Sequence, residues 1–238
     1  MADNSIFVVT AHVGDFVWRC GGAIALHARQ GIPVHLVCLS YGENGESNSA
    51  WVSAPQSDTS AVKQKRHAEA EKAADILGVK TLDFYDLGDY PLPHSRETIE
   101  RLARTMRAVK PRVVITHPAK DPSNLDHCRA FDMTLDARMH AMAPGHGPDF
   151  ISTPQILSFE PHQPEICDFK PSILLDITSV WDAKAQAMQA MATQKNLWAY
   201  YERVALQRGA QAGRRSQTTS VYGEAYQALF PLNLTTFF

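Results

Sequence analysis

Residues 5–16 read SIFVVTAHVGDF, and this stretch decides the fold. Its first half, SIFVVT, is a short apolar run rich in β-branched residues, which is typical of a strand buried on both faces of a parallel sheet. Its second half is a polar turn that carries His12 and Asp15. Because α/β proteins bind ligands beyond the carboxyl ends of their strands, this turn is the first candidate for a functional site.

Similar apolar runs alternate with helix-like segments along the rest of the chain. We predict further strands at 34–40, 81–85, 113–116, 155–159 and 173–177. We predict helices at 23–30, 60–77, 96–109, 179–208 and 222–229. This alternation indicates a Rossmann-like, doubly wound α/β fold, in which a mostly parallel sheet carries helices on both faces.

The chain is expected to form one domain. No stretch of its 238 residues has the composition of a linker, which favours a single domain over 1–238. Residues from about 142 to 172 are rich in Pro, Gly and His. We expect this segment to be an insertion that acts as a lid over the site, because long loops of this kind are commonly functional.

Composition and charge limit the partners. A net charge of -2 with scattered basic residues argues against binding to nucleic acid or to an anionic membrane. This charge pattern makes a small-molecule substrate the default. No run reaches the roughly 18 apolar residues of a membrane span, so we expect no membrane-spanning segment. The four cysteines lie far apart without a CxxC pair, which favours a reducing, cytoplasmic location. Enzymes of this size are commonly symmetric, so we expect a homo-oligomer.

A metal site is the first chemical hypothesis. His12 and Asp15 stand three residues apart in the first turn, and His127 ends the segment NLDH (124–127), which opens a predicted helix. The HxxD spacing alone is common in ordinary loops. Three such residues at carboxyl ends of strands are more specific, because two histidines and one carboxylate with an open fourth position make a catalytic zinc set. These ligands also accept cobalt, iron or manganese.

Several motifs carry a resemblance to a known family. They are AHVGDF (11–16), CGGAIA (20–25), RHAEAEKAADILGV (66–79), THP (116–118) and NLDH (124–127). Through them the chain resembles the LmbE/PIG-L family of zinc-dependent N-acetylglucosaminyl deacetylases, most closely over the first 130 residues or so. The resemblance implies that His12, Asp15 and His127 are the ligands of a zinc ion.

The chain departs from the deacetylase pattern at three polar positions. The resemblance places the general base of the deacetylases at position 14, where this chain has Gly14, and Phe16 replaces the following Glu. Asn124 stands where the family has a histidine that supports the oxyanion. Glycine cannot accept a proton, so this route to amide hydrolysis is lost while the metal positions remain.

With these departures, the chain resembles a divergent branch of the family, the 4-oxalomesaconate hydratases of bacterial gallate degradation. The resemblance implies a hydro-lyase that adds water to 4-oxalomesaconate, whose enol is 4-carboxy-2-hydroxymuconate, and forms 4-carboxy-4-hydroxy-2-oxoadipate. One alternative is a zinc-dependent N-deacetylase of an N-acetylated sugar or related amide, with another carboxylate as base. A metal-binding or sugar-binding module without catalysis is a further alternative.

Hydration of a conjugated double bond needs groups that move protons. Glu46, in YGENGES (41–47), follows the second predicted strand and is our candidate for proton exchange with water; Glu43 is its competitor. His162, in FEPHQPE (159–165), is the candidate for the second acid or base, because histidine exchanges protons near neutral pH. Either loop residue has an ordinary reading as a solvated surface group.

A polycarboxylate substrate requires cationic partners. Arg19, directly after the first turn, is the first choice, followed by Lys120 and Arg129. Each also has an ordinary reading as a solvated surface cation. His117 and Asp126 flank the metal candidates, and we expect them to orient the ligands through hydrogen bonds.

Overall fold

The computed structural model of the protein describes residues 4–53, 56, 58–214 and 219–232. Within these residues the strands are β1 (Ser5–His12), β2 (Val34–Ser40), β3 (Thr81–Phe84), β4 (Pro111–Thr116), β5 (Gln155–Phe159), β6 (Ile173–Asp176) and β7 (Gly223–Ala228). The α-helices are α1 (Asp15–Arg29), α2 (Asn48–Ser53), α3 (Thr59–Leu77), α4 (Arg96–Val109), α5 (Leu125–Met142), α6 (Trp181–Ala190) and α7 (Trp198–Gly213). Short 3-10 helices are η1 (Pro144–His146), η2 (Thr178–Val180) and η3 (Ala192–Leu197).

The described strands form one seven-stranded sheet in the order β3-β2-β1-β4-β5-β7-β6. β1 lies at the centre of the parallel part, where it pairs with β2 and β4, while β3 and β5 extend this part on either side. β7 runs antiparallel to both β5 and β6. The predicted single-domain α/β fold with a mostly parallel sheet is confirmed.

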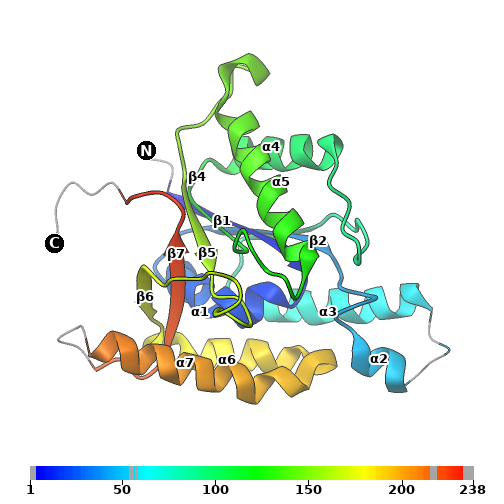
Figure 1. Ribbon diagram of the computed structural model, residues 1–238, viewed down its shortest axis with the longest axis vertical. Coiled ribbons are helices and arrows are strands. Elements are labelled where there is room, and N and C mark those ends of the chain that lie inside the picture. Colours follow the sequence, from blue (N-terminus) through cyan, green and yellow to red (C-terminus); the bar gives the residue numbers. More distant parts are fainter. Residues whose placement is uncertain (1–3, 54–55, 57, 215–218, 233–238) are drawn as a thin grey trace.

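Helices cover both faces of the sheet, as Figure 1 shows. α4 and α5 lie on one face, and α1, α3, α6 and α7 lie on the other. The side chains of β1 alternate between two apolar cores, with Ile6 and Val8 in one and Phe7 and Val9 in the other. Both faces of β1 are therefore buried, which explains its unbroken apolar run.

Helix α1 begins earlier than predicted, at Asp15, so the first turn leads straight into a helix. The helix is kinked at Cys20, whose φ is -141°, and the carboxylate of Glu224 accepts hydrogen bonds from the backbone N–H groups of Gly22 and Ala23. These contacts satisfy donors that the kink leaves free. A side chain at position 22 would meet Ile177 at 2.6 Å, so a glycine is required there.

The C-terminal part holds the main errors of the sequence prediction. The helix predicted at 222–229 is wrong: this segment contains strand β7, which is hydrogen-bonded on both sides. The helix predicted at 179–208 is broken into η2, α6, η3 and α7, with a non-helical residue at Gln194. Segment 222–229 contains a strand because it pairs with β5 and β6, which are distant in the sequence. Gln194 is held in its non-helical conformation by contacts described below.

The segment 142–172 contributes a sheet strand as well as loops. η1 and β5 belong to it, and β5 lies between β4 and β7. The loop after β5 carries His162 into the pocket described below. A lid role for this segment remains a prediction. Among the described residues, no helix is long and apolar enough to span a bilayer.

Candidate metal centre and active site

A pocket of about 250 Å³ lies at the carboxyl ends of the central strands. Its walls come from the turn after β1, the loop after β2, the start of α5, the loop after β5, and η3 with α7. This is the edge at which parallel α/β sheets bind ligands. The lining residues are His12, Gly14, Asp15, Trp18, Arg19, Glu46, Arg66, Tyr90, Ser123, Asn124, His127, His162, Gln194, Leu197 and Tyr201.

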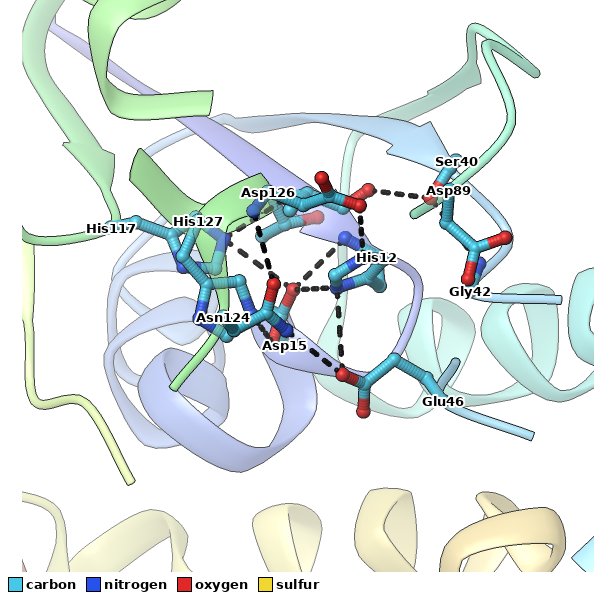
Figure 2. Close-up of polar contacts among 12 residues, drawn as sticks. His12, Asp15, Ser40, Gly42, Glu46, Asp89, His117, Asn124, Asp126 and His127 are labelled. Atoms are coloured by element: carbon cyan, nitrogen blue, oxygen red, sulfur yellow. Dashed lines mark hydrogen bonds and ion pairs between the residues drawn. The ribbon is translucent and has the colours of Figure 1, made fainter. Parts of the chain in front are cut away.

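The three predicted metal ligands all line this pocket, and Figure 2 shows them close to one another. Nδ1 of His12 lies 3.5 Å from Oδ2 of Asp15, and Nε2 of His127 lies 3.6 Å from Oδ1 of Asp15. All three side chains are buried. Two sets of side chains have ligand atoms close enough to share one ion: His12 with Glu46 and His127, and Asp15 with His117 and His127.

The residues present fit a divalent metal. Both ring nitrogens of His12 and Nε2 of His127 are buried without a hydrogen-bond partner among the described residues. Buried polar atoms without partners are costly, and a cation at this point would satisfy them. Nδ1 of His127 lies 2.8 Å from Oδ2 of Asp121, which directs Nε2 of the ring toward Asp15. A carboxylate behind a ligand histidine is a recurrent feature of metal sites.

The electrostatics of the centre favour a positive charge. Burial lowers the pKa of His12, but Asp126, Asp15 and Glu46 outweigh it and raise the pKa to about 10. Burial and the neighbouring His117 lower the pKa of His127 to about 3. Carboxylates around His12 thus require either a proton on this ring or a bound cation.

Asp126 and His117 lie beside the candidate ligands. Oδ2 of Asp126 is 3.6 Å from Nε2 of His12, and Asp126 also accepts hydrogen bonds from the backbone N–H groups of Tyr90 and Leu92. Nε2 of His117 accepts a hydrogen bond from the N–H of Ala11 and lies 3.4 Å from Oδ2 of Asp15. Sequence reasoning missed Asp121, because its distance from His127 depends on how the loop 117–124 folds back.

Glu46 reaches the centre from the loop after β2. Oε1 of Glu46 lies 4.0 Å from Nδ1 of His12. The same oxygen accepts hydrogen bonds from the hydroxyl of Tyr90 and from Nδ2 of Asn124, both at 3.0 Å. Its competitor Glu43 is not a lining residue and instead pairs with Lys63 at 3.3 Å. Of the two glutamates, Glu46 therefore faces the candidate metal.

Neighbouring loops hold Glu46 in place. The carboxylate of Asp89 accepts hydrogen bonds from the backbone N–H groups of Asn44 and Gly45, which fixes the loop that carries Glu46. Asn124 has two tasks: its Oδ1 accepts a hydrogen bond from the N–H of Asp126 at the start of α5, while its Nδ2 donates to Glu46. Asn124 therefore caps the start of α5 and at the same time is a hydrogen-bond partner of Glu46.

The predicted cationic residues divide into two groups. Arg19 is buried, lines the pocket and binds Oδ1 of Asp15 through Nε at 3.2 Å. In the part of the chain that the structure describes, Lys120 and Arg129 do not line the pocket; they pair with Asp168 and Asp126 at 2.7 and 2.8 Å.

Arg66 lines the pocket, and sequence reasoning did not identify it as a substrate contact. The side chain is fully buried on α3. Arg66 opens the motif RHAEAEKAADILGV (66–79) that supported the family resemblance, but an arginine on a polar helix is usually a solvated cation, so the motif did not indicate a place in the pocket.

His162 enters the pocket from the loop after β5. Its ring stacks on that of Tyr200 with the centroids 4.2 Å apart. Burial and the charge of Arg19 lower the pKa of His162. In the free protein this ring therefore favours its neutral form.

A Rossmann-like sheet with a His/Asp/His cluster at the end of its first strand defines an α/β protein with a candidate metal centre. A sequence model of the PIG-L family, described as GlcNAc-PI de-N-acetylase, matches residues 7–138. The chain belongs to the PIG-L family, as its motifs predicted.

Two relatives place the chain within this family. A 4-oxalmesaconate hydratase of Pseudomonas putida (strain KT2440) is 49% identical over 234 residues, which cover 96% of this chain and 90% of the relative. The diacetylchitobiose deacetylase of Thermococcus kodakarensis is 26% identical over 89% of this chain and 80% of its own.

The solved structures agree. The crystal structure of GalB, the 4-carboxy-2-hydroxymuconate hydratase from Pseudomonas putida KT2440, superimposes with a TM-score of 0.95 at 48% identity. The superposition covers 98% of this chain and 99% of the GalB chain. The N,N'-diacetylchitobiose deacetylase from Pyrococcus horikoshii shares the fold, with a TM-score of 0.79 at 23% identity.

Proposed function

We propose that the protein is a zinc-dependent hydro-lyase, a 4-oxalomesaconate hydratase of gallate catabolism. It adds water to 4-oxalomesaconate, or 4-carboxy-2-hydroxymuconate in the enol form, and yields 4-carboxy-4-hydroxy-2-oxoadipate. The observation that carries the proposal is the 49% identity, over nearly the full length of both chains, to a protein named 4-oxalmesaconate hydratase. The pocket supports it, because a carboxylate and a histidine stand beside a candidate metal centre.

His12, Asp15 and His127 would hold the metal, through the unpartnered ring nitrogens of the two histidines and the carboxylate of Asp15. When bound, the ion supplies a Lewis acid that stabilises negative charge on a substrate oxygen. Zinc suits two histidines and a carboxylate. His117 and Asp126 position this set through Asp15 and His12, at 3.4 and 3.6 Å.

Glu46 and His162 are assigned to the proton transfers of hydration. Water contributes its oxygen to one carbon of the double bond, and a proton joins the adjacent carbon. The groups around Glu46 donate hydrogen bonds to it, so its carboxylate is arranged to accept the proton from water. His162 is assigned to the proton at carbon. The negative charges of a bound polycarboxylate would favour its protonated form.

Arg19 is the main anchor for a substrate carboxylate, because its guanidinium is buried in the pocket wall. Arg66 adds positive charge on the same wall. Lys120 and Arg129 remain predictions as further carboxylate partners.

Cytoplasmic location and homo-oligomerisation are also part of the proposal. The four cysteines are free, which suits a reducing compartment.

Loss of ultraviolet absorbance of the conjugated substrate tests the function. The zinc-loaded protein should bleach 4-carboxy-2-hydroxymuconate without releasing acetate from any substrate. An N-deacetylase, the second candidate favoured by the 26% identity to diacetylchitobiose deacetylase, would release acetate from N-acetylated sugars and leave the conjugated acid intact. Intact absorbance with fully metallated protein would reject the hydratase assignment.

A further inference from the structure

Gln194 is a buried polar residue of η3 that the site described so far does not use. Its side chain reaches into the pocket across Gly14 and contacts three polar side chains there. Oε1 accepts hydrogen bonds from Nε1 of Trp18 at 3.2 Å and from Nη2 of Arg66 at 3.0 Å. Nε2 donates to Oε2 of Glu46 at 3.2 Å.

These contacts fix which way the amide of Gln194 faces. The indole N–H of Trp18 and the guanidinium of Arg66 can only donate hydrogen bonds, so both require the oxygen of the amide. The NH₂ group must then point at Glu46. Tyr90 and Asn124 bind Oε1 of Glu46, whereas Gln194 is the donor on Oε2 within the described part of the chain. Gln194 thus completes the set that determines the plane of this carboxylate.

The backbone around Gln194 is anchored from helix α3. Oε1 of Glu69 accepts hydrogen bonds from the backbone N–H of Thr193 at 2.8 Å and from its hydroxyl at 2.5 Å. The other oxygen of Glu69 binds Nη1 of Arg66 at 3.2 Å. All of these side chains are buried, so η3 is held at one fixed distance from the pocket. This explains the non-helical conformation of Gln194, with φ -121° and ψ 33°.

Position 14 must lack a side chain for this arrangement to exist. A Cβ atom on Gly14 would lie 2.4 Å from Oε1 of Gln194 and 2.8 Å from Nε1 of Trp18. The φ of Gly14 is -83°, which any residue adopts, so backbone strain does not require glycine here. Glycine is required because a side chain would occupy the space that the Gln194 amide fills. The glycine at position 14 therefore leaves room for the side chain of Gln194, 180 residues later in the sequence. In this room the Gln194 amide can donate its hydrogen bond to Glu46.

We propose that Gln194 is a positioning residue that holds the Glu46 carboxylate in the orientation needed for proton transfer. This inference rests on the proposed hydration, in which Glu46 accepts the proton from water. A loss of Gln194 leaves Oε2 of Glu46 without its amide donor, while the metal ligands and Arg19 keep their contacts. Arg66 loses one hydrogen bond but is still held by Glu69 and by the backbone oxygen of Tyr41, both at 3.2 Å. The chemical step should suffer, and substrate binding should change little.

Kinetics of Gln194→Ala and of the size-matched Gln194→Met test the proposal. We expect kcat to fall by about ten- to a hundredfold, with KM within about threefold of the parent value and zinc content unchanged. In a Glu46→Ala background the same substitutions should cause no further loss of kcat, because Gln194 acts through Glu46. Ser49→Ala is the matched control: it removes a hydrogen bond to the backbone oxygen of Thr193 in the same segment and should keep the parent kcat.

Two outcomes overturn the inference. One is a parent-like kcat in a folded Gln194 variant, and the other is an equal loss of kcat with and without Glu46. Crystal structures of the parent and of Gln194→Met give a readout independent of turnover: the Glu46 carboxylate should rotate, and an unchanged carboxylate contradicts the proposal. Parent protein that leaves the conjugated acid intact refutes the proposed function instead, and the structural comparison still decides the role of Gln194.

Discussion

Metal binding should release a proton from His12, and this is the prediction that the structure defines most fully. The imidazole of His12 lies among Asp15, Glu46 and Asp126, which raise its pKa to about 10. A histidine binds a metal through its neutral imidazole, so a cation can bind His12 only after this proton leaves. Below the raised pKa, affinity should therefore rise about tenfold for each pH unit.

Other ligands should not contribute protons in this range. Burial and His117 lower the pKa of His127 to about 3, so this ring is neutral near pH 7. Burial opposes ionisation of Asp15, but the neighbouring histidines outweigh it and hold its pKa well below the usual range. The net release on zinc binding should be about one proton per ion between roughly pH 6.5 and 8.5.

Competition with a chelator of known pH dependence measures the affinity slope, and calorimetry in buffers of different ionisation enthalpy counts the protons. Asp126→Asn is the informative variant, because Asp126 provides the largest effect that raises the pKa of His12. Its affinity should depend less on pH than that of the parent. A zinc affinity that does not change with pH, or release of no proton, would refute the account of His12.

Four further outcomes follow from the site. His12→Ala should leave folded protein without bound metal, and full occupancy in elemental analysis would contradict its role as ligand. Glu46→Ala should keep the metal yet lose about 10²- to 10⁴-fold in kcat, measured by absorbance; unchanged turnover would remove Glu46 from the mechanism. Asp121→Asn should weaken zinc about ten- to a hundredfold in chelator titrations, since Asp121 orients His127 at 2.8 Å. Gly14→Ala should lower kcat like loss of Gln194, because the new methyl would lie 2.4 Å from its amide oxygen; parent-like kcat would show that this space is not needed.

The parallel part of the fold could be predicted from local patterns. The strand predicted at 155–159 coincides with β5, and the predicted helices at 60–77 and 96–109 fall within one residue of α3 and α4 at each end. In the structure, the side chains of Asp58 and Ser95 cap the starts of these helices by accepting hydrogen bonds from the N–H groups of Ala61 and Thr98, and both residue types favour this position. Segment 222–229 has no such signal. Its conformation depends on pairing with β5 and β6, so a local pattern was insufficient.

Some residues of the candidate site could likewise be predicted from the sequence, and others could not. His12 and Asp15 belong to one turn, and the segment with His127 follows a neighbouring strand, so sheet topology brings all three together. Arg66 and Gln194 come from α3 and η3, whose approach to the pocket depends on packing among α3, α6 and the 3-10 segment. No periodicity in the sequence reports such packing, and both residues have ordinary readings where they stand.

The candidate metal ligands and the groups around Glu46 come from different parts of the fold, which suggests how one scaffold can support different chemistry. The candidate ligands sit on the first turn and the start of α5, where the central strands hold them rigidly. The groups around Glu46 come from loops and from the C-terminal region, as Tyr90, Asn124 and Gln194 show. A substitution at Gly14 should change the pocket at Gln194, Trp18 and Arg66, because the three atoms nearest to an added Cβ belong to these residues and none of them is a candidate ligand. On this fold, activity can therefore diverge through the groups around Glu46, which we propose to transfer protons, while the candidate metal ligands stay the same.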